Sequence, residues 1–281
     1  MLTAEQKAFF FENGYISIPN VLSPEIVAEL RSKILTIFKT NDWKKVEYNT
    51  EQVLCNIFNS YPEFVEIVLN KTLIDAVQSL LNSTPVLFPE TAIHYKFYTG
   101  WHKDSTSIEK SGEKFHLNDN AMFLQCGYYL QDNNELGGGL TVMPKSHKTT
   151  DNFIYPNSYS LSILDRIKLK LGSYSDEKNI RLNPNKHSVI DVPTKAGDLV
   201  IFNFKLNHSA TFPKKIKPES VPFEQSKLAV FNAFSNDTEN ANKYFAFITK
   251  REEPFYQSLK EYIPSQELLN TAEKLNFKVI I

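Results

Sequence analysis

The sequence predicts an α+β chain in which a helical N-terminal segment precedes a barrel or sandwich of short strands. Apolar residues recur at helical spacing before Pro85, and after it short apolar or alternating runs are separated by turn residues. Helices followed by a series of strands are typical of the α+β class. Because no linker rich in Pro, Gly or Ser divides the chain, we expect one domain over residues 1–281, with a helical segment at 1–84, a β-rich core at about 85–250 and a C-terminal extension at 251–281.

The helices are predicted from capping residues and apolar stripes. Thr3-Ala4-Glu5-Gln6 matches a capping box, and Gly14 is a typical residue to end the helix that it begins. Pro24 suits the first position of a second helix. The predicted helices are residues 3–13, 23–38, 61–82 and 265–275, with a short strand at 15–19 and an apolar strand after the last helix.

The strands are predicted from short apolar runs. These runs are residues 91–98, 121–131, 139–143, 188–193, 198–204, 227–235 and 243–249. Residues 133–139 form a glycine-rich turn, whereas residues 105–120 and 148–187 are long, polar and weakly patterned. Long loops of this kind in a compact domain commonly serve as lids or binding loops.

Composition excludes several classes of protein. The net charge of −1, from 31 basic and 32 acidic residues, does not suit a nucleic-acid binder. Cys55 and Cys126 are too few for a disulfide framework or a zinc knuckle, and their apolar neighbours predict buried thiols. No apolar run approaches the roughly 20 residues that span a bilayer. We expect a cytoplasmic protein of a reducing compartment, with no nucleic-acid or membrane partner.

The segment His102-Lys103-Asp104 carries the clearest chemical signal. In a strand, side chains at i and i+2 lie on the same side, so an imidazole and a carboxylate can face one ion. His208, far downstream, would complete two nitrogens and one oxygen on one face of a metal. That ligand set leaves coordination positions open and is typical of non-haem Fe(II) oxygenases.

Several motifs, in order along the chain, extend this signal over roughly residues 8–250. Together they resemble the phytanoyl-CoA dioxygenase family of Fe(II)/2-oxoglutarate oxygenases. The resemblance implies a double-stranded β-helix, or jelly-roll, barrel that uses Fe(II), 2-oxoglutarate and O2. The motifs are Phe11–Pro19 with Val21–Ser23, Trp101–Ser105, Tyr128–Asp132 with Gly138–His147, and Ala196–Phe202 with Asn207–Ser209.

The resemblance implies that His102, Asp104 and His208 are the metal ligands. Without it, His102 and Asp104 would be read as a surface pair and His208 as a hydrogen-bonded histidine at the end of a strand. Halogenases related to this family carry a small residue at the position of the carboxylate. Asp104 therefore favours hydroxylation or a related oxidation.

The expected anchor for 2-oxoglutarate departs from the family pattern. Family members place an arginine about ten residues after the distal histidine, where its planar fork binds the far carboxylate. Here no arginine lies between Arg181 and Arg251, and Lys227 stands at the start of the matching strand, after an enlarged loop at 209–226. The alternative for Lys227 is an exposed lysine at a strand edge.

Further candidates are less specific. Gln125 faces the barrel interior by alternation and would either contact the co-substrate or act as a structural hydrogen-bond partner. Thr141 and Ser209 are candidates for the same neighbourhood. Trp101 and Arg181 are candidates for substrate binding, because loops at the barrel mouth carry binding groups.

The sequence thus predicts an Fe(II)- and 2-oxoglutarate-dependent dioxygenase. It would hydroxylate an unactivated C–H bond of a small molecule, such as a natural product, a modified amino acid or an acyl derivative, and release succinate and CO2. The alternative is a non-catalytic jelly-roll relative that binds a small molecule or a metal, which the lysine and the enlarged loop would suit. A weaker third candidate is a metal-dependent barrel of another kind, such as an isomerase.

Overall fold

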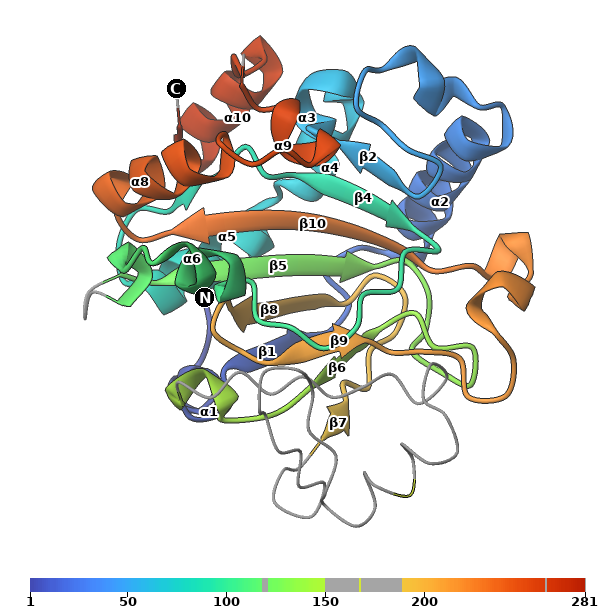
Figure 1. Ribbon diagram of the computed structural model, residues 1–281, viewed down its shortest axis with the longest axis horizontal. Coiled ribbons are helices and arrows are strands. Elements are labelled where there is room, and N and C mark those ends of the chain that lie inside the picture. Colours follow the sequence, from blue (N-terminus) through green and yellow to red (C-terminus); the bar gives the residue numbers. More distant parts are fainter. Residues whose placement is uncertain (118–120, 150–166, 168–188, 261, 281) are drawn as a thin grey trace.

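Two β-sheets lie face to face in the computed structural model, which describes all residues except 118–120, 150–166, 168–188, 261 and 281 (Figure 1). The larger sheet has the order β1-β8-β5-β10-β3-β11, and β4 joins it through β10 and carries β2. The smaller sheet has the order β7-β6-β9. The strands are β1 Tyr15–Ile18, β2 Val53–Cys55, β3 Val86–Leu87, β4 Ala92–Tyr95, β5 Phe123–Tyr129, β6 Leu140–Val142, β7 Ile190–Asp191, β8 Leu199–Asn203, β9 His208–Ala210, β10 Leu228–Ser235 and β11 Lys278–Val279.

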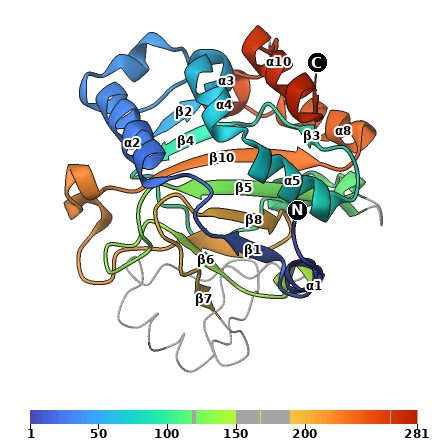
Figure 2. The same ribbon diagram turned by 180° about the vertical axis from the view of Figure 1, so that it is seen from behind.

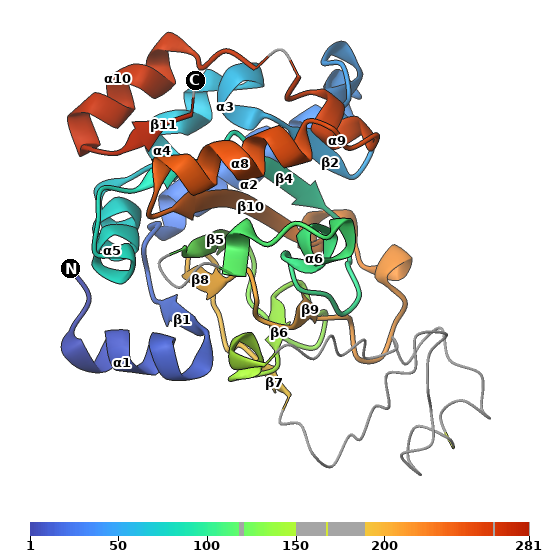
Figure 3. The same ribbon diagram turned by 60° about the vertical axis from the view of Figure 1, so that its left-hand side comes forward.

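Helices cover the back of the larger sheet (Figure 2). The amphipathic helices α2 and α5 lie against it, and their apolar stripes join the side chains of the sheet in one core. On the front, α8 lies beside β10 and α9 beside β2 (Figure 3). The helices are α1 Ala4–Asn13, α2 Pro24–Lys39, α3 Ile57–Ser60, α4 Val65–Val68, α5 Lys71–Leu81, α6 Thr106–Ser111, α8 Thr238–Ile248, α9 Pro254–Gln257 and α10 Gln266–Leu275.

Strand alternation decides which side chains face the space between the sheets. On β5, Leu124, Cys126 and Tyr128 pack into the core beneath the helices. Successive side chains of a strand point to opposite faces, so the odd-numbered residues of β5 point toward the smaller sheet. Tyr129 accordingly packs with Leu140 and other residues in a second core between the sheets. This arrangement is the jelly-roll barrel that the family resemblance implied.

The predicted elements at the two ends of the chain are confirmed. Thr3 and Gln6 form the capping box of α1, and Gly14 ends the helix in the left-handed conformation at φ 84°. Both predicted C-terminal elements, α10 and β11, are present. Because β1 pairs with β8 and β11 with β3, both ends contribute strands to the larger sheet. We propose on this basis that residues 1–281 act as one domain.

Two predicted elements are wrong. The helix predicted over 61–82 is broken at Asn70, whose side chain accepts a hydrogen bond from the Leu73 amide and so begins α5 anew. The strand predicted over 243–249 is instead part of α8. Asp237 caps that helix through the Glu239 amide. Its apolar residues therefore follow the 3.6-residue period of a helix. Over so short a run, that period cannot be distinguished from the pattern of a strand.

Two expectations from composition concern thiols and membranes. Cys55 and Cys126 are both buried free thiols, as predicted. Among the described residues, no helix combines the length and the apolar character needed to cross a bilayer.

Candidate metal centre

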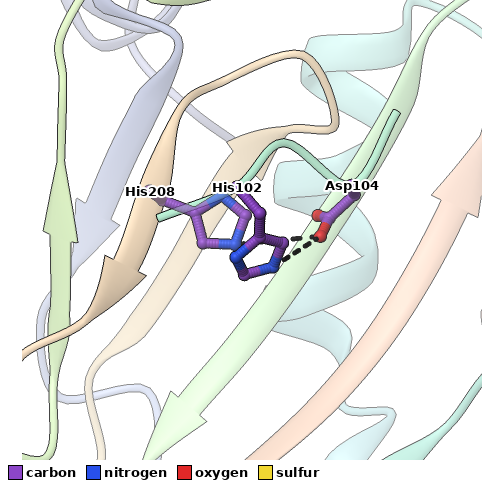
Figure 4. Close-up of side chains that lie close together, drawn as sticks. All are labelled: His102, Asp104 and His208. Atoms are coloured by element: carbon purple, nitrogen blue, oxygen red, sulfur yellow. Dashed lines mark ion pairs between the residues drawn. The ribbon is translucent and has the colours of Figure 1, made fainter. Parts of the chain in front are cut away.

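His102 and His208 come together through their backbones. His208 is the first residue of β9, and His102 forms an isolated antiparallel bridge with it. Each amide donates to the carbonyl of the other residue over 2.9 Å. The strand predicted through Asp104 is wrong, because Asp104 already lies in the turn that leads into α6. The turn nevertheless directs its carboxylate toward both imidazoles (Figure 4).

Backbone carbonyls fix the orientation of both rings. The Nδ1 atom of His102 lies 2.7 Å from the Gly100 carbonyl oxygen, and that of His208 lies 3.0 Å from the Leu206 carbonyl oxygen. A carbonyl only accepts, so each Nδ1 carries the proton and donates it. Each Nε2 is therefore left with a lone pair, which is the arrangement found in histidines that bind metals.

The three ligand atoms are close enough to share one cation. The Asp104 Oδ1 atom lies 3.6 Å from His102 Nε2 and 3.7 Å from His208 Nε2, and the three candidate ligand atoms all lie within 4.8 Å of one another. An octahedral ion about 2.1 Å from its ligands brings neighbouring ligand atoms to about 3 Å, so small side-chain rotations suffice. The other oxygen, Oδ2, is buried with no hydrogen-bond partner among the described residues. These residues fit a divalent metal.

The charge states of His208 and Asp104 suit a cation as well. Burial and the neighbouring His102 ring lower the pKa of His208 to about 4, so His208 is neutral near pH 7. Burial raises the pKa of Asp104, but the two imidazoles, His208 first, outweigh burial and hold it below its usual value. Burial likewise lowers the pKa of His102, but Asp104 and the Gly100 carbonyl outweigh it, and the pKa of His102 is raised. Asp104 thus supplies the negative charge at the centre.

Two cavities meet at these ligands. The larger, of about 550 Å³, extends from His102 and Asp104 toward α8 and α9. The smaller, of about 80 Å³, lies between the sheets and is lined by all three ligand residues and by Lys227. His102, Asp104 and Gln125 line both. A metal held here would therefore be reached from both cavities.

Comparison with known proteins agrees with this geometry. Residues 10–212 match the sequence profile of the phytanoyl-CoA dioxygenase (PhyH) family, which is more than half of the chain. The chain belongs to the phytanoyl-CoA dioxygenase family. The family predicted from the ordered motifs is thereby confirmed.

The individual relatives have low sequence identity to this chain. The ectoine dioxygenase of Sphingopyxis alaskensis is 24% identical over 258 residues, covering 85% of this chain and 78% of the relative. The ectoine dioxygenase of Nocardia farcinica is 23% identical over 253 residues, covering 83% and 78%.

Solved structures share the fold. The S. alaskensis enzyme with 2-oxoglutarate and 5-hydroxyectoine aligns with a TM-score of 0.58 and 20% identity, over 85% of this chain and 77% of that one. The carbocyclase SnoK from nogalamycin biosynthesis, described as non-haem and α-ketoglutarate dependent, aligns with a TM-score of 0.57 and 17% identity, over 84% of both chains.

Lys227 lies inside the barrel of this family member. Its side chain is 3% exposed, so the alternative of an exposed edge lysine is wrong. The Nζ atom donates to the Phe97 carbonyl oxygen over 2.6 Å and lies 5.3 Å from the centre of the Tyr98 ring. Burial lowers the pKa of Lys227 to about 7. Among the described residues no carboxylate pairs with this ammonium, and a buried ammonium is unfavourable without one, so this part of the smaller cavity is suited to an anion.

Gln125 and His94 also line the cavities. Gln125 does so from β5, on the face that alternation predicted. His94 lines both cavities from β4, between the rings of Phe97 and Phe231 at 4.9 Å from each. Burial lowers the pKa of His94 to about 3, so its imidazole is neutral. His94 was not predicted, although its alternation with Ile93, which is in the core, would have placed it toward the barrel interior.

Thr141 and Ser209 do not reach the cavities, which corrects the prediction for both. They are directly paired between β6 and β9, one position out of phase with Val142 and His208. Side chains therefore alternate, and these two point to the outer face of the smaller sheet. There the Thr141 hydroxyl bonds to Asp191 Oδ1 and to the Thr211 hydroxyl, each over 2.8 Å.

Neither candidate for substrate binding, Trp101 or Arg181, is among the described residues that line the two cavities. Trp101 is half-buried next to His102 but is absent from the described lining of both cavities. Arg181 lies outside the described residues. The lining of the larger cavity includes Glu90, Tyr244, Arg251 and Tyr256. Tyr244 was not predicted because its segment was assigned to a strand, and Glu90 was not predicted because it precedes the predicted strand.

Proposed function

We propose that the chain is an Fe(II)- and 2-oxoglutarate-dependent dioxygenase that oxidises an unactivated C–H bond of a small molecule. The observation that carries the proposal is the position of the two histidines and Asp104 at the junction of two cavities. One cavity offers a buried cation for a co-substrate, and the other offers space for a second molecule beside the same ligands.

In this proposal His102, Asp104 and His208 hold the iron. Two nitrogens and one carboxylate leave the remaining coordination positions open. When bound, the iron supplies the chemistry that couples O2 to the oxidative decarboxylation of 2-oxoglutarate, with succinate and CO2 as products. The Gly100 and Leu206 carbonyls hold both imidazoles in the required tautomer, so the ligands are ordered before the metal arrives.

Lys227 is the proposed anchor for the far carboxylate of 2-oxoglutarate. It lines the same 80 Å³ cavity as the metal ligands, and an ammonium binds a carboxylate as a point charge. Gln125 offers an amide to the co-substrate from the neighbouring wall. Phe202, Leu140 and Phe231 contribute apolar surface to the lining of this cavity and limit the access of water to the reacting groups.

The class of reaction and substrate is proposed from the size of the site and from relatives. A cavity of about 550 Å³ suits a small molecule, which would be oriented for attack by its walls. We propose hydroxylation because Asp104 retains the carboxylate and because both curated relatives are dioxygenases named for ectoine. Structural neighbours include an epimerase and a carbocyclase, so the fold also hosts other outcomes of C–H oxidation.

Succinate formation tests the proposal. The protein with Fe(II), 2-oxoglutarate and O2 should form succinate slowly even without a substrate. Asp104→Ala should abolish this activity, whereas Asp75→Ala, which removes a partly exposed carboxylate that pairs with Lys71 on α5, should leave it unchanged. An iron-loaded wild-type protein that forms no succinate would be the non-catalytic relative instead.

A further inference from the structure

One wall of the larger cavity holds a carboxylate beside two tyrosines. Glu90 precedes β4, and its Oε2 atom accepts a short hydrogen bond from the Tyr244 hydroxyl of α8. Tyr256 of α9 lines the same cavity. Three separate elements therefore direct a carboxylate and two hydroxyls into one region of the cavity.

The guanidinium of Arg251, which lines the same cavity, pairs with another carboxylate. Arg251 lies 4.0 Å above the Tyr256 ring and donates to both carboxylate oxygens of Glu253, over 2.5 and 3.2 Å. The hydrogen bond that Glu90 accepts comes from the neutral Tyr244 hydroxyl. Glu90 is partly buried, and a carboxylate withdrawn from water needs a cation or strong donors, so among the described residues its negative charge is only partly compensated.

The ionisation of Glu90 reflects this position. Burial raises the pKa of Glu90 to about 7, and the charge of Asp104 adds to the effect, whereas the tyrosine hydroxyls and Arg251 oppose it. Glu90 is therefore an anion above neutral pH, with a desolvation cost that a bound cation would remove.

Aromatic rings line the cavity that Glu90 also lines. A cation over the face of such a ring is attracted by its quadrupole, and the attraction grows when water is excluded. The rings that line the cavity are those of Phe97, Phe204, Phe231, Tyr244, Phe255 and Tyr256.

We infer that Glu90, with Tyr244 and Tyr256, binds a basic nitrogen of the substrate, a protonated amine or an amidine. This inference rests on the proposed function, because it assigns the larger cavity to the molecule that is oxidised. Glu90 then determines specificity: it holds the cationic end of the substrate at α8 and α9, and the rest of the molecule extends toward His102 and Asp104, which line the same cavity.

Three probes that share a cyclohexylmethyl group and differ in the charge of the end group test the inference. The binding of cyclohexylmethylamine, cyclohexylmethanol and cyclohexylacetate is measured by calorimetry, with and without Fe(II) and 2-oxoglutarate under anaerobic conditions. At about pH 8 the amine is protonated and Glu90 is ionised. The amine should bind at least about tenfold more tightly than the alcohol or the acetate, which corresponds to about 1.4 kcal/mol.

Glu90→Gln should remove this preference. The amide still accepts from Tyr244, so the fold should persist, as circular dichroism and thermal melting would show. The amine should bind about tenfold more weakly to Glu90→Gln, while the alcohol changes less than twofold. Tyr256→Phe is a second variant, and it should weaken the binding of the amine but not the binding of the other two probes. Glu239→Gln, an exposed change on α8 at a residue paired with Lys243, is the matched control and should have no effect.

Four results would overturn the inference. They are failure of the amine to bind at millimolar concentration, equal binding of the three probes to the wild type, an unchanged preference in Glu90→Gln, and tighter binding of the acetate. The last result would assign the site to the cations that line the same cavity, Arg251 and Lys110. Succinate formation without substrate, measured in air on the same protein preparations, reports the proposed function separately, so either conclusion can fail alone.

Discussion

His102 and His208 are joined by two backbone hydrogen bonds, in which each amide donates to the carbonyl of the other residue over 2.9 Å. Their rings lie 4.3 Å apart, at 54° to one another. Two segments far apart in the chain are thus held together at His102 and His208, the two proposed nitrogen ligands of the metal. The ligands are ordered by the smaller sheet and do not depend on the ion for their approach.

Metal binding should therefore raise stability without reorganising the fold. Mn(II) at about 100 times its Kd should raise the free energy of unfolding by about 2.7 kcal/mol, because the ion binds only the folded chain. The shift is measured as a change in Tm by differential scanning fluorimetry. Asp104→Ala should fold and lose the shift. A shift of equal size in that variant would place the ion elsewhere.

Lys227→Met should impair the use of 2-oxoglutarate. Without the ammonium, the far carboxylate loses its ionic partner in the smaller cavity, so KM for 2-oxoglutarate should rise at least about tenfold, equivalent to about 1.4 kcal/mol or more. Steady-state succinate formation measures KM. Lys243→Met removes an exposed lysine of α8 and is the control. Equal KM values for wild type and Lys227→Met would exclude the anchoring role.

The same lysine predicts a pH dependence. Burial lowers the pKa of Lys227 to about 7, so the ammonium is present below that pH and is lost as the pH rises above it. KM for 2-oxoglutarate should accordingly increase as the pH is raised from about 6 to about 9. Lys227→Arg should flatten the profile, because a guanidinium stays charged throughout this range. A flat profile in the wild type would contradict the assignment.

Thr141→Val separates a structural role from a co-substrate role. The Thr141 hydroxyl bonds to Asp191 and Thr211 on the outer face of the smaller sheet. Its loss should cost about 1 kcal/mol of stability and change KM for 2-oxoglutarate less than twofold. Gln125→Ala, which alters the cavity wall, should raise KM severalfold. Urea unfolding and succinate assays measure the two effects. A raised KM in Thr141→Val at unchanged stability would restore Thr141 to the site.

The sequence indicated the three side chains that the structure brings together better than it indicated their setting. Residue types and motif order indicated His102, Asp104 and His208, although Asp104 lies in a turn where a strand was assumed. Lys227 was found as the single cation at the matching strand start. Thr141 and Ser209 were misplaced because a three-residue strand gives too little pattern to decide which face is buried.

The far wall of the larger cavity was not predictable in the same way. Glu90 and Tyr256 are brought together only by the tertiary arrangement of β4 and α9. Tyr244 stands in a run of apolar residues whose period fits a strand as well as a helix over so short a length. Asp237, which caps α8, was the local signal that could have settled that choice.

The most direct test of the central claim is an anaerobic titration of the protein with Fe(II) and 2-oxoglutarate, followed by visible absorption. A metal-to-ligand charge-transfer band should appear in the wild type and be lost in both Asp104→Ala and His208→Ala, whereas Lys227→Met should keep the band but need more 2-oxoglutarate to reach it. A band of unchanged intensity in the Asp104 and His208 variants, or no band in the wild type, would contradict an iron centre built from these three side chains.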